Sequence, residues 1–232
     1  MKFNDEFFKA LNRWQKGWSE DQEKKKEFTS ALKKECETID IKYKTVDCPC
    51  YRKRYLHQGE LVDIIINDNK IEGVTSWTTD VRYAEFFKGL FRDGAVTAAI
   101  FEHIPKKGEV ILNINKLWEC EDFIKDIENF KERNPDECDA IYHFEDGQNE
   151  VILEVPLKGS EICILSGKSS PFDDICDSVN IPEEERPKVF KELIDNGAFI
   201  EEIRYVKDEA ARNAIKNTIR SFYELLQNNN YR

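Results

Sequence analysis

No apolar run in this 232-residue sequence is long enough to cross a bilayer. The longest runs, such as Leu61 to Ile66, fall far short of the roughly 20 apolar residues that a membrane helix requires. The opening residues, Met1 to Asp5, also lack the apolar core of a secretory signal. We therefore expect a cytoplasmic protein that does not enter a membrane.

Basic residues are outnumbered, because 35 lysines and arginines face 46 aspartates and glutamates and the formal net charge is -11. This balance excludes a general electrostatic attraction to nucleic acid or to an anionic membrane. A polyanion would have to meet a local basic patch. One basic run is present, formed by Lys42, Lys44, Arg52, Lys53 and Arg54.

Residues that bind metals are few and scattered. The three histidines, His57, His103 and His143, are far apart, and Cys48-Pro49-Cys50 is not followed by a second pair at ligand spacing. The seven cysteines are an odd number without regular spacing, in a chain whose 40% apolar residues can bury a core without disulfides. We expect reduced thiols and no metal site.

The apolar pattern changes period along the chain and predicts an α+β fold in a single domain, 1–232. Helices are expected in 1–40, a core in 41–165 and a helical extension in 166–232. The expected helices are Phe3 to Trp14, a second one from a Ser19 cap to Cys36, Val81 to Phe91, Glu121 to Phe130, Glu183 to Asp195 and Asp208 to Leu226. The expected strands are Ile41 to Thr45, Leu61 to Ile66, Ile71 to Ser76, Ala95 to Phe101, Glu109 to Ile114, Ala140 to Phe144, Glu150 to Val155 and Phe199 to Val206. Pro105 to Gly108 predicts a turn that joins Ala95 to Phe101 and Glu109 to Ile114 in a hairpin or a close relative of one.

Three short motifs follow one another where strands should begin or end: Tyr51-Arg52, Ser76-Trp77-Thr78 and Gln148-Asn149-Glu150. Arg52 offers a planar fork of donors to phosphate oxygens. Ser76 and Thr78 are two residues apart, so they share a strand face and Trp77 points to the other. Glu150 opens an apolar strand, which would hold its carboxylate rigidly and partly out of water. Gln148 lies two residues earlier and shares that face if the strand extends so far.

Each motif has a simpler interpretation when it is taken alone. An arginine in a mixed-charge strand is usually a surface residue, Ser-Trp-Thr is ordinary strand composition, and Gln-Asn-Glu is common after a turn. Arg54 also competes with Arg52, because both lie on one face of the same strand. The aromatic residue before Arg52 favours Arg52.

From Ile41 to Val155 the sequence resembles the ADP-ribosyltransferase superfamily, in its Arg-Ser-Glu class. Tyr51-Arg52 is similar to the family's aromatic-arginine pair, and Gln148-Asn149-Glu150 to the loop that ends in its catalytic glutamate. Ser76-Trp77-Thr78 is similar to its Ser-Thr-Ser strand, with Trp77 in place of the middle residue. The resemblance implies two packed, mostly antiparallel sheets and NAD as the substrate. It assigns catalysis to Glu150 and Gln148, and NAD binding to the other two motifs: Tyr51, Arg52, Ser76, Trp77 and Thr78.

Cleavage of nicotinamide from NAD builds positive charge on the ribose, as in glycoside hydrolysis, and nicotinamide is a good leaving group. Such an enzyme needs to hold the pyrophosphate and to place a carboxylate beside the ribose. Within the family, a glutamine two residues before the glutamate is similar to enzymes that modify asparagine or nucleobases. We therefore expect a transferase that moves ADP-ribose to a base in RNA or DNA, with RNA favoured over DNA.

The resemblance also implies an intracellular toxin of a toxin-antitoxin or antiviral defence system, held by an antitoxin and a chaperone, that blocks translation by modifying mRNA. Two alternatives stay open. One is an enzyme that modifies an asparagine or another protein side chain. The other is a non-catalytic domain that binds NAD or a partner.

Overall fold

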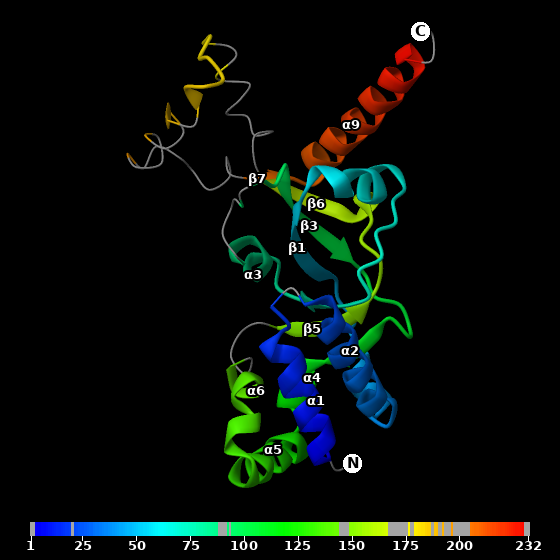
Figure 1. Ribbon diagram of the computed structural model, residues 1–232, viewed down its shortest axis with the longest axis vertical. Coiled ribbons are helices and arrows are strands. Elements are labelled where there is room, and N and C mark those ends of the chain that lie inside the picture. Colours follow the sequence, from blue (N-terminus) through cyan, green and yellow to red (C-terminus); the bar gives the residue numbers. More distant parts are fainter. Residues whose placement is uncertain are drawn as a thin grey trace. The chain divides into compact units, whose positions relative to one another are not determined.

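The computed structural model describes residues 3–19, 21–87, 92, 94–143, 149–166, 176, 179–186, 188–189, 192, 196 and 205–229. These residues form a mixed α+β fold, which confirms the expected class (Figure 1). The helices are α1 (Asp5–Lys16), α2 (Gln22–Glu37), α3 (Val81–Phe86), α4 (Ile114–Trp118), α5 (Glu121–Arg133), α6 (Asp139–His143) and α9 (Asp208–Asn229). Short helical turns are η1 (Ile41–Lys44), η2 (Gln58–Glu60), η3 (Val62–Ile66), η4 (Pro135–Glu137) and η5 (Gly159–Glu161). The strands are β1 (Cys50–Leu56), β2 (Val74–Thr78), β3 (Thr97–His103), β4 (Val110–Asn113), β5 (Glu150–Glu154), β6 (Ile162–Ser166) and β7 (Tyr205–Lys207).

The strands are hydrogen-bonded in the order β4-β5-β2-β1-β3-β6-β7. They form one antiparallel sheet among the described residues, whereas the family resemblance implies two. By its internal contacts the chain divides into two compact units. The first comprises Met1–Tyr51, Glu72–Tyr83 and His103–Val155, and the second comprises Arg52–Ile71, Ala84–Glu102 and Pro156–Arg232.

The core of the first unit is built largely on α1. Its apolar residues recur at helical spacing, and Phe7, Leu11 and Trp14 are buried. The side chain of Asn4 caps the helix by accepting a hydrogen bond of 2.7 Å from the N–H of Phe7. Gly17 ends the helix at a φ of 78°, a conformation that glycine adopts without strain. The expected first helix is confirmed.

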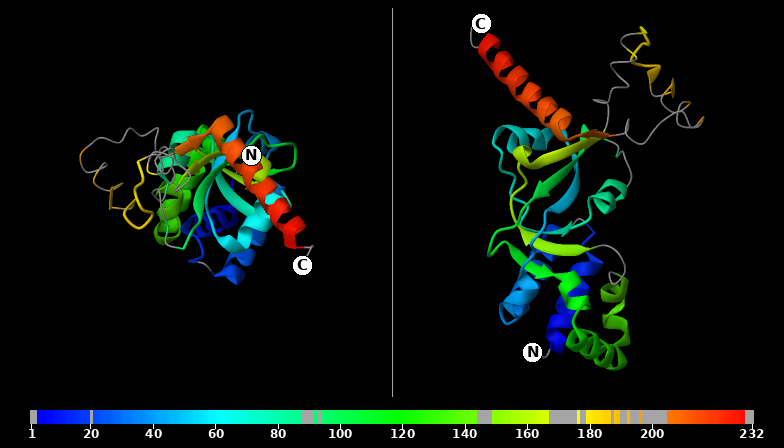
Figure 2. Two further views of the ribbon diagram at one scale, coloured as in Figure 1. Left: turned by 90° about the horizontal axis from the view of Figure 1, so that it is seen from above. Right: turned by 180° about the vertical axis from the view of Figure 1, so that it is seen from behind.

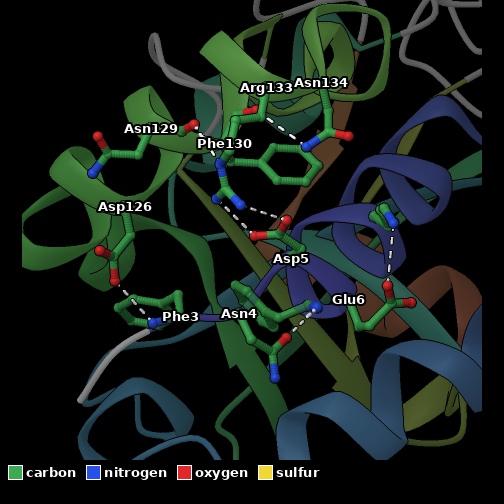
Figure 3. A network of polar contacts seen from close by, with 11 residues as sticks. Phe3, Asn4, Asp5, Glu6, Asp126, Asn129, Phe130, Arg133 and Asn134 are labelled. Atoms are coloured by element: carbon green, nitrogen blue, oxygen red, sulfur yellow. Dashed lines mark hydrogen bonds and ion pairs between the residues drawn. The ribbon is translucent and has the colours of Figure 1, made fainter.

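Polar contacts tie the start of α1 to α5 (Figure 3). The guanidinium of Arg133 donates to both carboxylate oxygens of Asp5, at 2.8 and 2.9 Å. The backbone N–H of Phe3 donates to the carboxylate of Asp126 at 2.9 Å. These contacts fix how α1 lies against α5, and α5 itself matches the expected helix that begins at Glu121.

The second helix begins later than expected, because Asp21 rather than Ser19 is its N-cap. The carboxylate of Asp21 accepts hydrogen bonds from the N–H groups of Glu23 and Lys24. An ionised carboxylate also interacts favourably with the positive end of a helix, which a serine hydroxyl cannot match.

Two expected strands of the first unit are helical instead. Ile41 to Thr45 begins with a 3-10 turn because Asp40 caps the N–H of Lys42, and Tyr43 is the residue of this turn that enters the core. Ala140 to Phe144 falls mainly in α6, where the side chain of Asn12 accepts a hydrogen bond of 2.9 Å from the N–H of Ala140. That cap comes from α1, far away in the sequence.

The second unit contains most of β1 and β3, together with β6, β7 and α9. Ala211 and Ile215 are the buried residues of the first half of α9, which packs on β6. Both views of Figure 2 show α9 continuing directly from β7. The expected helix from Asp208 is confirmed. None of the described helices is both long and apolar enough to span a bilayer.

Two further expectations fail. Leu61 to Ile66 is largely the helical turn η3 rather than a strand, since a short and mostly apolar run does not distinguish the two. The expected hairpin is absent from the described residues, because β3 pairs with β6 and β4 pairs with β5. Six of the thirteen positions of the expected helix Glu183 to Asp195 lie outside the described residues, as does the start of the expected strand at Phe199.

Candidate active site

Glu150 opens β5 and is buried there, with 5% of its surface exposed. Asn149, just before it, has a φ of 47°, a left-handed conformation that asparagine tolerates better than most residues. The carbonyl of Asn149 accepts a hydrogen bond of 3.0 Å from the N–H of Thr79. The start of β5 is thereby joined to the end of β2, which fixes the backbone that carries Glu150.

The register of β2 and β5 brings the two hydroxyl residues to the carboxylate. Thr78 lies directly opposite Glu150, and Ser76 lies opposite Ile152. Residues opposite each other in an antiparallel pair share a face, so Ser76, Thr78 and Glu150 are on one side of the sheet. Ser76 donates a hydrogen bond to the carboxylate. The predicted sharing of a face by Ser76 and Thr78 is confirmed.

A third polar group at this point comes from α1. The amide nitrogen of Gln15, Nε2, donates to Oε2 of Glu150 at 3.1 Å. Sequence reasoning missed this residue, because 135 positions separate it from Glu150 and its local pattern shows only the end of an amphipathic helix. No signal in a single sequence would have found it.

The electrostatics of Glu150 follow from its burial. Burial raises the pKa of its carboxyl above the ordinary value of 4.5, while hydrogen bonds from Ser76 and Gln15 act in the opposite direction. Burial also raises the pKa of Tyr83, and the negative charge of Glu150 raises it further. Tyr83 therefore lies within electrostatic range of the carboxylate. A carboxylate held out of water interacts more strongly with a cation than an exposed one does.

Thr78 has a structural task as well as its place beside Glu150. Its hydroxyl oxygen accepts a hydrogen bond of 3.1 Å from the N–H of Asp80. The carboxylate of Asp80 in turn accepts one of 2.9 Å from the N–H of Arg82, in the first turn of α3. Thr78 thus shapes the connection between β2 and α3.

Trp77 is separated from the other two residues of its motif. It lies on the opposite face of β2, is 2% exposed, and donates from its indole nitrogen to the hydroxyl of Thr75 at 3.0 Å. Its ring lies 5.9 Å from the ring of His103. This burial favours a place in the core over a contact with NAD.

The remaining predicted residues are less closely tied to Glu150. Tyr51 pairs with Thr78 across β1 and β2, so it shares the face of Glu150. Arg52 follows Tyr51, is half-buried, and belongs to the second unit. By strand alternation it lies on the other face of β1 from Tyr51. Gln148 lies outside the described residues. The first unit therefore brings together Glu150, Ser76, Thr78 and Tyr51.

Within the described part of the chain, no group of three or more histidine, cysteine, aspartate or glutamate side chains is placed to hold a metal ion. All seven cysteines are free thiols, and Cys48 is the exposed member of the Cys48-Pro49-Cys50 pair. A carboxylate with hydroxyl and amide donors around it can instead bind a ligand hydroxyl and stabilise positive charge beside it.

Comparison with known proteins adds no relative: no family model, no curated protein and no solved structure matches the chain.

Proposed function

We propose that this protein is an NAD-dependent mono-ADP-ribosyltransferase with Glu150 as its catalytic carboxylate. The observation that supports the proposal is the placement of Glu150 at the start of β5, buried, opposite Thr78 and hydrogen-bonded by Ser76. These are the residues of two motifs that lie more than seventy positions apart in the sequence. Their common face is the arrangement that the proposed chemistry requires.

The proposed reaction replaces one bond to the ribose C1′ by another. The bond from C1′ to the nicotinamide nitrogen breaks, and nicotinamide leaves with the electron pair. Glu150 accepts a hydrogen bond from a ribose hydroxyl and stabilises the positive charge on the sugar. A nucleophilic nitrogen of the acceptor then attacks C1′ and gives up a proton. Ser76 orients the carboxylate by donating a hydrogen bond to it. The family resemblance, rather than the geometry of this face, assigns the pyrophosphate of NAD to Arg52.

We propose a base in RNA as the acceptor. Gln148 is the residue type that accompanies nucleobase or asparagine acceptors in the superfamily, and an amide can pair with the edge of a base. The basic run that includes Lys42 and Lys44 offers a local site for phosphates despite the net charge of -11. On this proposal the protein is a defence toxin that stops translation and is held by an antitoxin and a chaperone.

The proposal is tested with labelled NAD and a single substitution, Glu150→Gln. We expect the native protein to release nicotinamide and label nucleic acid, and the variant to lose at least about a hundredfold in rate. Nuclease or protease treatment of the labelled product identifies the acceptor. Label that survives nuclease and disappears with protease contradicts the RNA acceptor. Equal NAD turnover by both proteins contradicts the enzyme itself.

A further inference from the structure

Gln15 contacts Glu150 with only one end of its amide. Its nitrogen Nε2 donates to Glu150 at 3.1 Å. Its oxygen Oε1 is shielded from solvent and has no hydrogen-bond partner among the described residues. A buried acceptor without a donor costs stability, so such atoms are uncommon in folded proteins.

The charge of Glu150 explains which way the amide points. An ionised carboxylate only accepts hydrogen bonds, so the nitrogen of Gln15 must face it and the oxygen must face elsewhere. A role confined to packing α1 against β5 would account for the donor end. It would not account for an acceptor held beside the catalytic carboxylate.

We propose that Gln15 is a positioning residue of this site, and that its amide oxygen accepts a hydrogen bond from NAD. The inference rests on the function proposed above. NAD carries donors close to the bond that breaks, namely the hydroxyls of the nicotinamide ribose and the N–H groups of the carboxamide. A ligand that places one ribose hydroxyl on Glu150 brings these donors to Gln15. The nitrogen of Gln15 then holds the carboxylate in place, and its oxygen binds NAD.

The test uses Gln15→Met, which keeps the length of the side chain and removes both ends of the amide. Gln15→Asn keeps an amide and shortens its reach, and serves if the methionine variant fails to fold. Arg13→Met is the matched control, because Arg13 is an exposed residue of the same helix. Each protein is assayed with NAD, with nicotinic acid adenine dinucleotide, and with NAD that lacks a hydroxyl on the nicotinamide ribose.

We expect both Gln15 variants to lose about tenfold or more in kcat/KM with NAD, and Arg13→Met to match the native protein. The two Gln15 variants should also lose most of the native preference for NAD over one of the two analogues. A collapse for the nicotinic acid analogue identifies the carboxamide as the donor, and a collapse for the deoxy analogue identifies the ribose. Gln15 variants that keep both preferences and the native rate overturn the proposal.

A second readout separates this inference from the proposed function. Loss of the Gln15 donor should move the acidic limb of the pH profile upward, since that donor favours the ionised carboxylate. The described titratable neighbour, Tyr83, stays neutral there because its pKa is raised. If the native protein does not turn over NAD, the proposed function fails. Carbon-13 NMR of Glu150 then still tests the contact, and an unchanged pKa in Gln15→Met overturns it.

Discussion

At the residue scale, Glu150 is largely buried, and the effect of its carboxyl group on stability therefore depends on pH. Its pKa in the folded protein is raised above the ordinary 4.5, so the folded state holds the proton more tightly than the unfolded state. The folded protein therefore loses stability as the pH rises from about 4.5 through the raised pKa. We expect Glu150→Gln to stabilise the protein at neutral pH by roughly 1 kcal/mol or more, because the substitution removes the buried charge.

Urea unfolding at a series of pH values measures this effect. The gain from Glu150→Gln should shrink toward zero below about pH 4, where Glu150 is protonated in both states. Glu154→Gln is the matched control on the same strand, because Glu154 is exposed and pairs with Lys33 at 2.7 Å. That pair contributes roughly 0–1 kcal/mol, so its loss should give no gain at neutral pH. A gain from Glu150→Gln that is independent of pH contradicts the raised pKa.

The choice between the two arginines of β1 is also made at this scale. Arg54 forms an ion pair with Glu60 at 2.9 Å. We expect Arg52→Ala to weaken NAD binding by about tenfold or more, since an arginine fork on a phosphate is a charge-assisted contact. Arg54→Ala should change affinity much less. Calorimetric titration with NAD measures both, and the opposite ranking would show that Arg54 is the ligand.

At the scale of elements, the turn η5 approaches η3 so closely that only glycine fits at one point. A Cβ added to Gly159 would lie 2.7 Å from the carbonyl oxygen of Ile64 and 3.0 Å from Cα of Ile65. Both neighbours are backbone atoms, so one of the turns must move. We expect Gly159→Ala to lower the free energy of unfolding by about 1–3 kcal/mol.

Gly59→Ala is the control for this prediction. A Cβ at Gly59 meets nothing within 4 Å, and the residue lies in the turn η2 of the same unit. Because alanine restricts the unfolded chain, this change should be neutral or slightly stabilising. Denaturant unfolding of both variants compares them. Equal changes in the free energy of unfolding at the two positions would contradict the close backbone contact between η5 and η3.

The elements that the sequence predicted well are those with a strong and long period. The helices α1, α5 and α9 carry apolar residues at helical spacing. The N-cap of α1, Asn4, is also the residue directly before the helix. The failures have tertiary causes. α6 receives a cap from Asn12, and the pairing of β3 with β6 joins segments some sixty residues apart. Local pattern does not contain either fact.

At the scale of the whole molecule, the candidate site was predictable in its parts and not in its assembly. Alternation along β2 placed Ser76 with Thr78, and the apolar run after Glu150 predicted its strand. The register that sets Thr78 against Glu150 is a long-range pairing. The contact between Gln15 and Glu150 could not be predicted from the sequence, because only folding brings the end of α1 to the start of β5.

The two units are interleaved along the chain, since each is assembled from three separate segments. A ribosome makes the chain from its N-terminus, and the first unit needs every residue up to Val155 before its last strand, β5, is in place. The second unit must wait longer, for β6, β7 and α9. No unit is complete before Val155 has been made, so until then a nascent chain exposes strands whose partners are still missing. Any contiguous fragment that holds the whole of one unit also holds part of the other. Two fragments of a divided chain would therefore have to associate before both units are complete.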